Sequence, residues 1–450
     1  MRYIMKFLFM VCYSSSFAQW EVMGDAGFSD GLAYNITMEV DASGTPYVAF
    51  ADGANGQKPT VMKFNGSQWL TVGSAGISES HALSPVLKLG EDGTPFVAFA
   101  DGANGQRCSV MKFDGTNWVY VGIPGFTAGL LSLLDLDIAP DGMPYVAYGD
   151  NTEENRSTVM KYNGTSWEIV GSPGFSPNDA GYTQIAVSGN GTPYCAYLDV
   201  PFGTLTVKKF DGSHWVAVGD SSFVQDGTTP QLMLDNDDSL YLGYLLGSGG
   251  VGVQKFIGVG NTGWELIGGV FATNTIPSYL TFDINQEGVP YLAYSSLADS
   301  CKTSARKFDN GSWSFVGSEP AFSDTSKWPV VAVDYNGMVY LAFQDYTQDR
   351  KLTVMRFEDV NGISTPQNSK NGLDIFPNPA IDVIYVPHKN YPVTEKLYVT
   401  IWNIEGKLLI QKNYTNDAKL DIGILIPGIY YVSIMTADFK ELEHSLLVKQ

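Results

Sequence analysis

The feature that most constrains the fold of this chain is a repeat of about 49 residues that fills positions 19–360. Every unit carries a Trp-x-x-x-Gly pentapeptide. The intervals between successive tryptophans are 49, 49, 49, 48, 49 and 49 residues: Trp20, Trp69, Trp118, Trp167, Trp215, Trp264 and Trp313. A fixed period of this length is typical of repeat architectures, in which each unit buries its apolar face against its neighbours.

Each unit contains four strand-like segments, which in the first unit cover residues 35–40, 45–52, 60–64 and 68–73. The segments are short, rich in β-branched and aromatic residues, and bounded by turn residues. With 48 glycines, the composition is that of a turn-rich protein. Seven four-stranded units of this size predict an all-β fold, a seven-bladed β-propeller.

The order of the segments indicates that the ring is closed by the N-terminus. The last unit, residues 329–357, lacks its tryptophan segment, whereas Trp20–Gly24 precedes the first unit as an isolated copy of that segment. If this copy pairs antiparallel with Val354–Phe357, no sheet keeps an open edge. The alternative is a solenoid of stacked sheets, which would leave incomplete sheets at both ends.

The first residues are typical of a signal peptide. Arg2 and Lys6 flank an apolar run, and Ser16 and Ala18 supply the small residues that precede a cleavage site. A buried N-terminal strand is the alternative. The predicted domain organisation is a signal peptide (1–18), a propeller (19–360), a linker (361–371) and a C-terminal domain (372–450).

The C-terminal segment has a different pattern of alternating strands and polar turns, which predicts a small β-sandwich. It contains "FPNPA" at 376–380, "NIEGKLL" at 403–409 and "DIGILIPGIYYV" at 421–432. These residues resemble the type A sorting domain of the type IX (Por) secretion system, an Ig-like domain. The residues that carry the resemblance are Pro377, Asn378, Pro379, Asp382, Gly428, Tyr430 and Lys449. The family more often has Ser where Gly423 stands.

The resemblance implies that the secretion machinery is a partner of this domain. It implies export across the outer membrane, so the chain is expected to be secreted or attached to the outer cell surface. The propeller is then the mature working part.

Charge and residue types narrow the function further. The net charge of −20 disfavours phosphate backbones and anionic membrane surfaces. No stretch after the signal segment is apolar and long enough to span a bilayer. The propeller has two histidines, His81 and His214, and no paired Cys or His spacing. We therefore predict no catalytic constellation, no metal site and no cofactor.

One face of the predicted propeller repeats two residue types. The loops between second and third strands begin with aspartates: Asp52, Asp101, Asp150, Asp199 and Asp345. The connections between units carry phenylalanines: Phe28, Phe126, Phe175, Phe223 and Phe322. Carboxylates near aromatic rings can bind sugars, so these residues form the candidate ligand-binding set. The alternative is that the aspartates cap turns and the phenylalanines pack between blades.

Two functions remain open. The first is non-catalytic binding or adhesion to an extracellular glycan or other ligand, and the second is an extracellular hydrolase or lyase acting on polysaccharide or protein. The fifth unit departs most from the repeat, at 245–256, and is a second candidate location for a site.

Cross-strand neighbours are also predicted. If "NG" at 65–66 is a two-residue turn, Met62 faces Trp69. The repeated lysines, of which Lys63 is the first, are expected opposite a small residue such as Ala49, over which the lysine stem would pack.

Overall fold

The structure is a computed structural model, and it describes residues 19–220, 223–258, 263–271, 277–296, 300–357, 380, 382–386, 396–403, 407–414, 418–426, 428–436 and 441–449. The chain divides into two compact units, Met1–Asp359 and Val360–Gln450. The predicted signal peptide and linker lie outside the described residues.

The larger unit is all-β. Its described residues form sheets of the same four-stranded kind and short 3₁₀ turns, with no α-helix among them. The innermost strand of each sheet is β2 (Ala33–Val40), β6 (Ala82–Leu89), β10 (Leu131–Ile138), β14 (Ala180–Val187), β19 (Gly227–Leu234), β23 (Pro277–Ile284) or β27 (Ser326–Val333). The second strand is β3 (Pro46–Asp52), β7 (Pro95–Asp101), β11 (Pro144–Asp150), β15 (Pro193–Asp199), β20 (Leu240–Leu246), β24 (Pro290–Ser296) or β28 (Val339–Asp345).

The outer half of each sheet follows the same order. The third strand is β4 (Lys58–Phe64), β8 (Arg107–Phe113), β12 (Arg156–Tyr162), β16 (Thr204–Phe210), β21 (Val251–Phe256), β25 (Lys302–Asp309) or β29 (Lys351–Phe357). The fourth is β5 (Trp69–Thr71), β9 (Trp118–Tyr120), β13 (Trp167–Ile169), β17 (Trp215–Ala217), β22 (Trp264–Leu266), β26 (Ser312–Phe315) or β1 (Glu21–Val22). A short extra strand, β18 (Val224–Gln225), pairs with β16.

The N-terminal strand β1 completes the sheet of β27, β28 and β29. It runs antiparallel to β29, with Glu21 opposite Arg356 and Val22 opposite Met355. The Arg356 guanidinium lies 2.9 Å from the Glu21 carboxylate. Two segments more than 330 residues apart in the chain therefore share one sheet.

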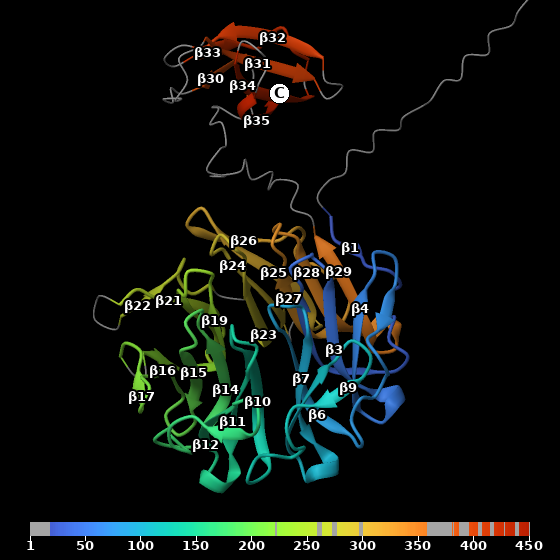
Figure 1. The fold of residues 1–450 in the computed structure, drawn as a ribbon, viewed down its shortest axis with the longest axis vertical. Helices are drawn as coiled ribbons and strands as arrows, with labels where there is room; N and C mark the ends of the chain where they lie inside the picture. Colours follow the sequence, from blue (N-terminus) through green and yellow to red (C-terminus); the bar gives the residue numbers. More distant parts are fainter. Residues whose placement is uncertain are drawn as a thin grey trace, which may run out of the picture. The chain divides into compact units, whose positions relative to one another are not determined.

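Neighbouring sheets are joined by the repeated tryptophans. Each indole Nε1 donates to a backbone carbonyl of the fourth strand in the preceding sheet, or just past its end, as Trp118 does to Val72 at 2.8 Å. Trp69 donates to Met23, just after β1, and Trp20 donates to Val316, just after β26. The innermost strands also contact one another in chain order, and β27 contacts β2. Figure 1 shows the sheets side by side in this order.

The second strands form the core. All seven residues of β3, β7, β11 and β28 are buried, because these strands have a neighbour on each side and a sheet packed on each face. Their sequences are nearly continuous apolar runs that end in an aspartate, as in the PYVAFAD of β3. Each of these second strands therefore positions its terminal aspartate at one end of its sheet.

The cross-strand predictions were wrong in register. Asn65 N donates to Gln68 O, and Asn65 Oδ1 accepts from the backbone N–H groups of Ser67 and Gln68, so the loop spans four residues. Phe64 therefore faces Trp69, and Met62 faces Thr71.

The predicted partner of the repeated lysine was wrong as well. Lys63 lies opposite Tyr47, not Ala49, and its ammonium lies 5.7 Å from the centre of the Tyr47 ring. The lysine therefore meets an aromatic face rather than a small residue.

The described residues of the smaller unit form two sheets. One has the order β32 (Leu408–Asn413), β31 (Leu397–Asn403), β34 (Gly428–Thr436) and β35 (Glu441–Lys449); the other pairs β30 (Val383–Val386) with β33 (Ala418–Asp421). Val399, Ile401, Val432 and Ile384 are fully buried in its core. This arrangement agrees with the predicted small β-sandwich.

Candidate functional site

The five repeated aspartates are buried, with 0–6% of each exposed. Asp52, Asp101, Asp150 and Asp345 cap 3₁₀ turns, which are η1 (Gly53–Asn55), η2 (Gly102–Asn104), η3 (Asn151–Glu153) and η5 (Tyr346–Gln348). The Asp101 carboxylate accepts from Ala103 N, Asn104 Nδ2 and Ser109 Oγ at 2.8–3.0 Å. Asp199 instead accepts from Asn178 Nδ2. These bonds assign Asp52, Asp101, Asp150 and Asp345 to turn capping and Asp199 to a contact with Asn178.

The repeated phenylalanines are half-buried and stack on the tryptophan rings. Ring centres are 4.0–4.5 Å apart in four pairs: Phe28–Trp69, Phe126–Trp167, Phe175–Trp215 and Phe223–Trp264. Phe322 instead lies 4.4 Å from Phe343. These ring contacts place the phenylalanines between the sheets. The contacts of the aspartates and phenylalanines therefore lend no support to the sequence prediction that the two sets form one ligand-binding surface.

The start of every innermost strand contains a bulge. In β27, the pairing with β28 shifts between Lys327 and Val330, and the other six innermost strands shift at the same place. One non-glycine residue in each bulge has a left-handed backbone, with φ between 46° and 62°: Asn35, Ser84, Leu133, Tyr182, Thr229, Tyr279 and Trp328. Bulges of this kind re-aim side chains at the rims of β structures.

Aromatic side chains gather at three neighbouring bulges. The Trp328 ring lies edge-on to Tyr34 and to Tyr279, with ring centres 5.9 Å apart in both pairs. Tyr346 starts η5, the turn that follows β28, and β28 pairs with the β27 strand of Trp328. Tyr279 is 41% exposed and Tyr346 is 37% exposed. We call Tyr34, Tyr279, Trp328 and Tyr346 the aromatic cluster.

A lysine ammonium belongs to this cluster. Lys327 Nζ lies 5.5 Å from the centre of the Tyr346 ring, and its hydrogen bond to Tyr346 raises the pKa of Lys327 above its usual value. Among the described residues, no carboxylate lies within ion-pair distance of this ammonium. The cluster thus combines aromatic rings with a positive charge for which the described residues supply no carboxylate.

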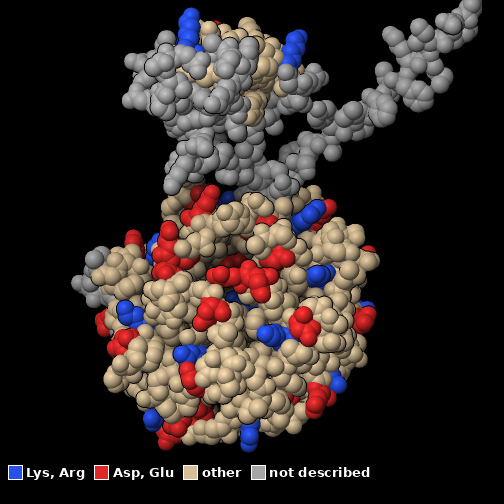
Figure 2. Space-filling model, viewed as in Figure 1, with Lys and Arg blue, Asp and Glu red and all other residues tan. Residues whose placement is uncertain are grey.

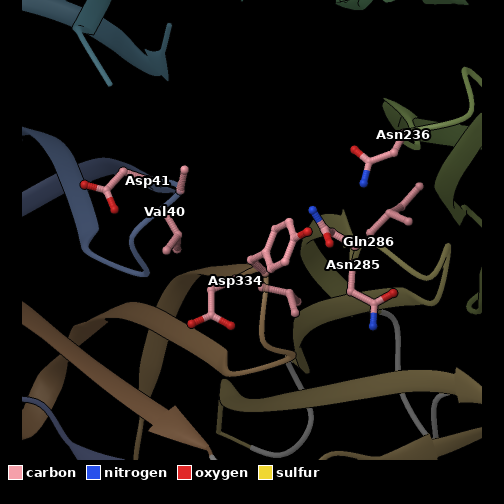
Figure 3. A pocket seen from close by; sticks show the side chains of 10 residues that line it. Val40, Asp41, Asn236, Asn285, Gln286 and Asp334 are labelled. Atoms are coloured by element: carbon pink, nitrogen blue, oxygen red, sulfur yellow. The ribbon is translucent and has the colours of Figure 1, made fainter. Parts of the chain in front are cut away.

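The opposite ends of the innermost strands form a pocket of about 160 Å³. Its lining comes from the turns that join first and second strands in four sheets: Val40, Asp41, Ala42, Asn236, Ile284, Asn285, Gln286, Val333, Asp334 and Tyr335. Figure 3 shows Asp41 on one side of the hollow and Asn236, Asn285 and Gln286 on the other. We call this hollow the turn pocket.

Hydrogen bonds within the turns hold the pocket walls in place. Asp41 Oδ1 accepts from Ser43 N and Thr45 N, both at 2.9 Å, and the equivalent oxygen of Asp334 accepts from Asn336 N. The side chains of Asn236 and Gln286 are exposed, and Tyr335 is 65% exposed. The pocket therefore presents an aromatic ring, amides and the half-buried Asp41 carboxylate to solvent, while Asp334 is buried.

A group of charged residues lies along the innermost strands between the two ends. Lys88 Nζ contacts the Glu39 carboxylate at 2.7 Å. Burial raises the pKa of Asp135 to about 6 and that of Asp283 to about 7. Asp135 Oδ2 accepts from Ile185 N at 2.9 Å, and Asp283 Oδ2 accepts from Val333 N at 2.7 Å. These carboxylates link neighbouring sheets. Figure 2 shows acidic side chains around a hollow of the larger unit.

Sequence reasoning missed the residues that the structure exposes at the two ends. Trp328 is the one tryptophan of the first 360 residues outside the 49-residue series. Tyr335 occupies a turn position where the other units have Ala, Glu, Pro, Gly, Asn or Gln. Both residues could have been singled out from the sequence because they differ from the residues at the equivalent positions of the other units. In the fifth unit, Leu246 N donates to Gly250 O, so the divergent segment there is a tight turn.

The sorting residues of the smaller unit are described in part. Pro377, Asn378 and Pro379 lie outside the described residues. Tyr430 is buried, and its hydroxyl donates to Ile426 O at 2.8 Å. Lys449 is 7% exposed and lies opposite Gly428 in the sheet, and the backbone O of Asp382 accepts from Ile422 N.

Comparison with known families identifies the smaller unit. Residues 374–449 match the family described as the secretion system C-terminal sorting domain. This confirms the predicted type IX sorting domain, and the chain is a secreted or cell-surface protein whose partner is the type IX machinery. No helix among the described residues is long and apolar enough to cross a membrane. No curated protein sequence matches the chain.

Solved structures resemble the chain at a distance. A mutant of AofleA from Arthrobotrys oligospora has 12% identity and a TM-score of 0.45, covering 66% of this chain and 88% of that one. A mutant of the Aleuria aurantia lectin has 15% identity and a TM-score of 0.44, covering 65% and 96%. The extracellular domain of a putative hybrid two-component system from B. thetaiotaomicron has 11% identity and a TM-score of 0.49, covering 96% and 57%.

Proposed function

We propose that this protein is a secreted, non-catalytic glycan-binding propeller, and that a sugar residue binds in the turn pocket. The observation that carries the proposal is the lining of that pocket. Tyr335 offers an exposed ring, and Asn236, Gln286 and Asp41 offer amide and carboxylate groups around it.

The chemistry of the lining favours a neutral, hydroxyl-rich ligand. Sugar hydroxyls both donate and accept hydrogen bonds, as do amides, while carboxylates accept only. The faces of sugar rings are apolar and pack on aromatic rings. None of the residues lining the turn pocket is a lysine or arginine, so the lining offers no cation to an anionic ligand. Its volume of about 160 Å³ is smaller than the ~300–1,000 Å³ of pockets for drug-sized ligands, so it suits a single sugar residue.

The architecture proposed for this function is a closed ring of seven blades over residues 19–360, preceded by a signal peptide (1–18) and followed by a linker (361–371) and the sorting domain (372–450). Two observations support the closed ring: β1 pairs with β29, and β27 contacts β2. Closure brings turns from the first, fifth, sixth and seventh sheets around one pocket, which an open array would separate.

A glycan array probed with the full chain tests the function, and two variants test the site. Tyr335→Ala removes the pocket ring. Phe202→Ala is the matched control, because Phe202 is 69% exposed and does not line the pocket. We expect wild type and Phe202→Ala to bind the same glycans and Tyr335→Ala to lose at least tenfold in affinity. If the wild-type chain binds no glycan, or if it hydrolyses one, the proposed function is wrong.

A further inference from the structure

The aromatic cluster lies at the opposite ends of the innermost strands from the turn pocket. Trp328 and Tyr335 are separated by seven residues along β27 and its turn, which corresponds to roughly 20 Å of extended strand. The cluster is therefore a separate surface. Its residues come from the first, sixth and seventh sheets: Tyr34 from β2, Tyr279 from β23 and Trp328 from β27, with Tyr346 from η5.

Two residues of the aromatic cluster have a left-handed backbone conformation that bulky side chains disfavour. Tyr279 has φ 62° and Trp328 has φ 50°. Bulky residues are rare in this left-handed region, whereas Asn, which the first sheet has at position 35, adopts it more readily. Unfavourable backbone of this kind tends to gather at functional sites. The fold requires the bulge, since all seven sheets have it, but it does not require an aromatic ring there.

The exposed rings form a surface with a definite chemistry. Tyr279 and Tyr346 are both more than one third exposed, and Trp328 links Tyr279 to Tyr34 through edge-on contacts. Such a surface offers apolar faces and phenol hydroxyls, which suit the apolar faces and hydroxyls of sugar rings.

The charge of Lys327 selects among sugars. Its ammonium lies over the Tyr346 ring, and among the residues that the structure describes it has no carboxylate partner. The whole chain has a net charge of −20, so a cation inside an aromatic surface stands out and is the complement of an anionic group.

We propose that the aromatic cluster binds a uronic acid residue of an anionic polysaccharide. The sugar ring packs on Tyr279 and Trp328, and its carboxylate pairs with Lys327. This inference rests on the proposed function for the class of ligand, glycan, and it adds a second site with a different specificity. An acidic peptide could form an ion pair with Lys327, but it has no sugar ring to pack on the aromatic rings. The experiment below distinguishes a peptide from a uronic acid.

Three probes separate the contribution of the sugar rings from that of the carboxylates. A hexamer of galacturonic acid carries both sugar rings and carboxylates. Its methyl ester keeps the rings and removes the charge, and a glutamate hexapeptide keeps the charge and removes the rings. Binding is measured by calorimetry with the full chain, in low salt and again in high salt, because ion pairs at the surface are screened by salt.

Three variants accompany the wild type. Lys327→Met removes the ammonium and keeps the stem. Trp328→Asn removes the ring and places Asn at a left-handed position. Lys63→Met is the matched control, because Lys63 also lies over a tyrosine ring, 5.7 Å from the centre of Tyr47, but outside the cluster.

We expect the wild type and Lys63→Met to bind the acidic hexamer at least tenfold more tightly than its ester or the peptide. Lys327→Met should lose this preference, and Trp328→Asn should lose binding to both sugars while its melting temperature stays the same or rises. Equal binding of the peptide, or unchanged binding by Lys327→Met, would overturn the inference. If Trp328→Asn does not fold, Lys327→Met decides alone.

The outcome is distinguishable from that of the proposed function. Tyr335→Ala should leave binding of the acidic hexamer unchanged. If the wild type binds neutral glycans through Tyr335 and ignores the acidic hexamer, the inference fails and the proposed function stands.

Discussion

At the outer edge of each sheet, one tryptophan recurs in every unit and makes the same hydrogen bond to the preceding sheet. At the start of each innermost strand, the backbone recurs but the side chain does not: Asn35, Ser84, Leu133, Tyr182, Thr229, Tyr279 and Trp328. Repetition of a side chain therefore marks what holds the sheets together. Variation on a repeated backbone marks positions that the fold leaves free for recognition.

The largest effect should come from replacing the repeated tryptophan next to β1, where the N-terminal strand pairs with β29. Trp20 is 6% exposed, lies 5.3 Å from the Phe357 ring and donates to Val316 O. Trp20→Ala should lower the free energy of unfolding by ~3–5 kcal/mol, because a large buried ring is lost. Denaturant unfolding measures this. Val22→Ala is the control on the same strand and should cost little, since Val22 is 38% exposed. A Trp20→Ala chain as stable as wild type would contradict the role of the tryptophan.

Replacing a repeated aspartate should have an intermediate effect on stability and none on recognition. Asp101→Ala removes three hydrogen bonds from a buried turn cap and should cost ~1–3 kcal/mol. Glycan binding by the folded variant should match that of wild type. Lost binding without lost stability would return the aspartates to the ligand site.

These constant features account for most of what could be predicted from the sequence. The 49-residue period and the isolated Trp20 segment predicted the four-stranded sheets and the partner of β1, because both depend on spacing along the chain. The register between third and fourth strands was wrong, because the Asn65 side chain closes a four-residue loop where two residues were expected. The register was therefore set by a side-chain hydrogen bond and not by the spacing of the residues.

The candidate binding residues chosen from the sequence differ from those of the proposed turn pocket for a related reason. Asp52 and Phe28 stood out because they repeat, but their hydrogen bonds and ring contacts use them within the fold. The turn pocket depends on the proximity of Asp41 and Asn236, which are far apart in the chain and belong to different sheets. No local pattern encodes that proximity.

The pH dependence of stability should report on a buried carboxylate, Asp283, near the end of β23. The pKa of Asp283 is raised from 3.8 to about 7, mainly by burial, so the folded chain binds this proton more tightly than the unfolded chain. The resulting stability is complete below pH ~3.8 and is lost as the pH rises through about 7. Wild type and Asp283→Asn should be equally stable near pH 4, and the variant should be the more stable above pH 7. Chemical denaturation across this range measures the difference, and a constant difference would contradict the raised pKa.

The smallest expected effect comes from relieving the backbone at a bulge that belongs to neither proposed site. Thr229 has φ 46°, and its buried Oγ1 finds no hydrogen-bond partner among the residues that the structure describes. Thr229→Asn should raise the free energy of unfolding by about 1 kcal/mol, because Asn adopts this conformation more readily. Thermal unfolding measures the gain. Destabilisation by this change would show that the bulge side chain matters to the fold.

The most direct test of whether recognition uses the varied residues is a crystal structure of the chain with the tightest-binding glycan from the array. We expect sugar against Tyr335 in the turn pocket, with an acidic glycan also against Trp328 and Lys327. Sugar bound instead at the repeated loops of Asp52 and Asp101, in equivalent positions of several sheets, would contradict it.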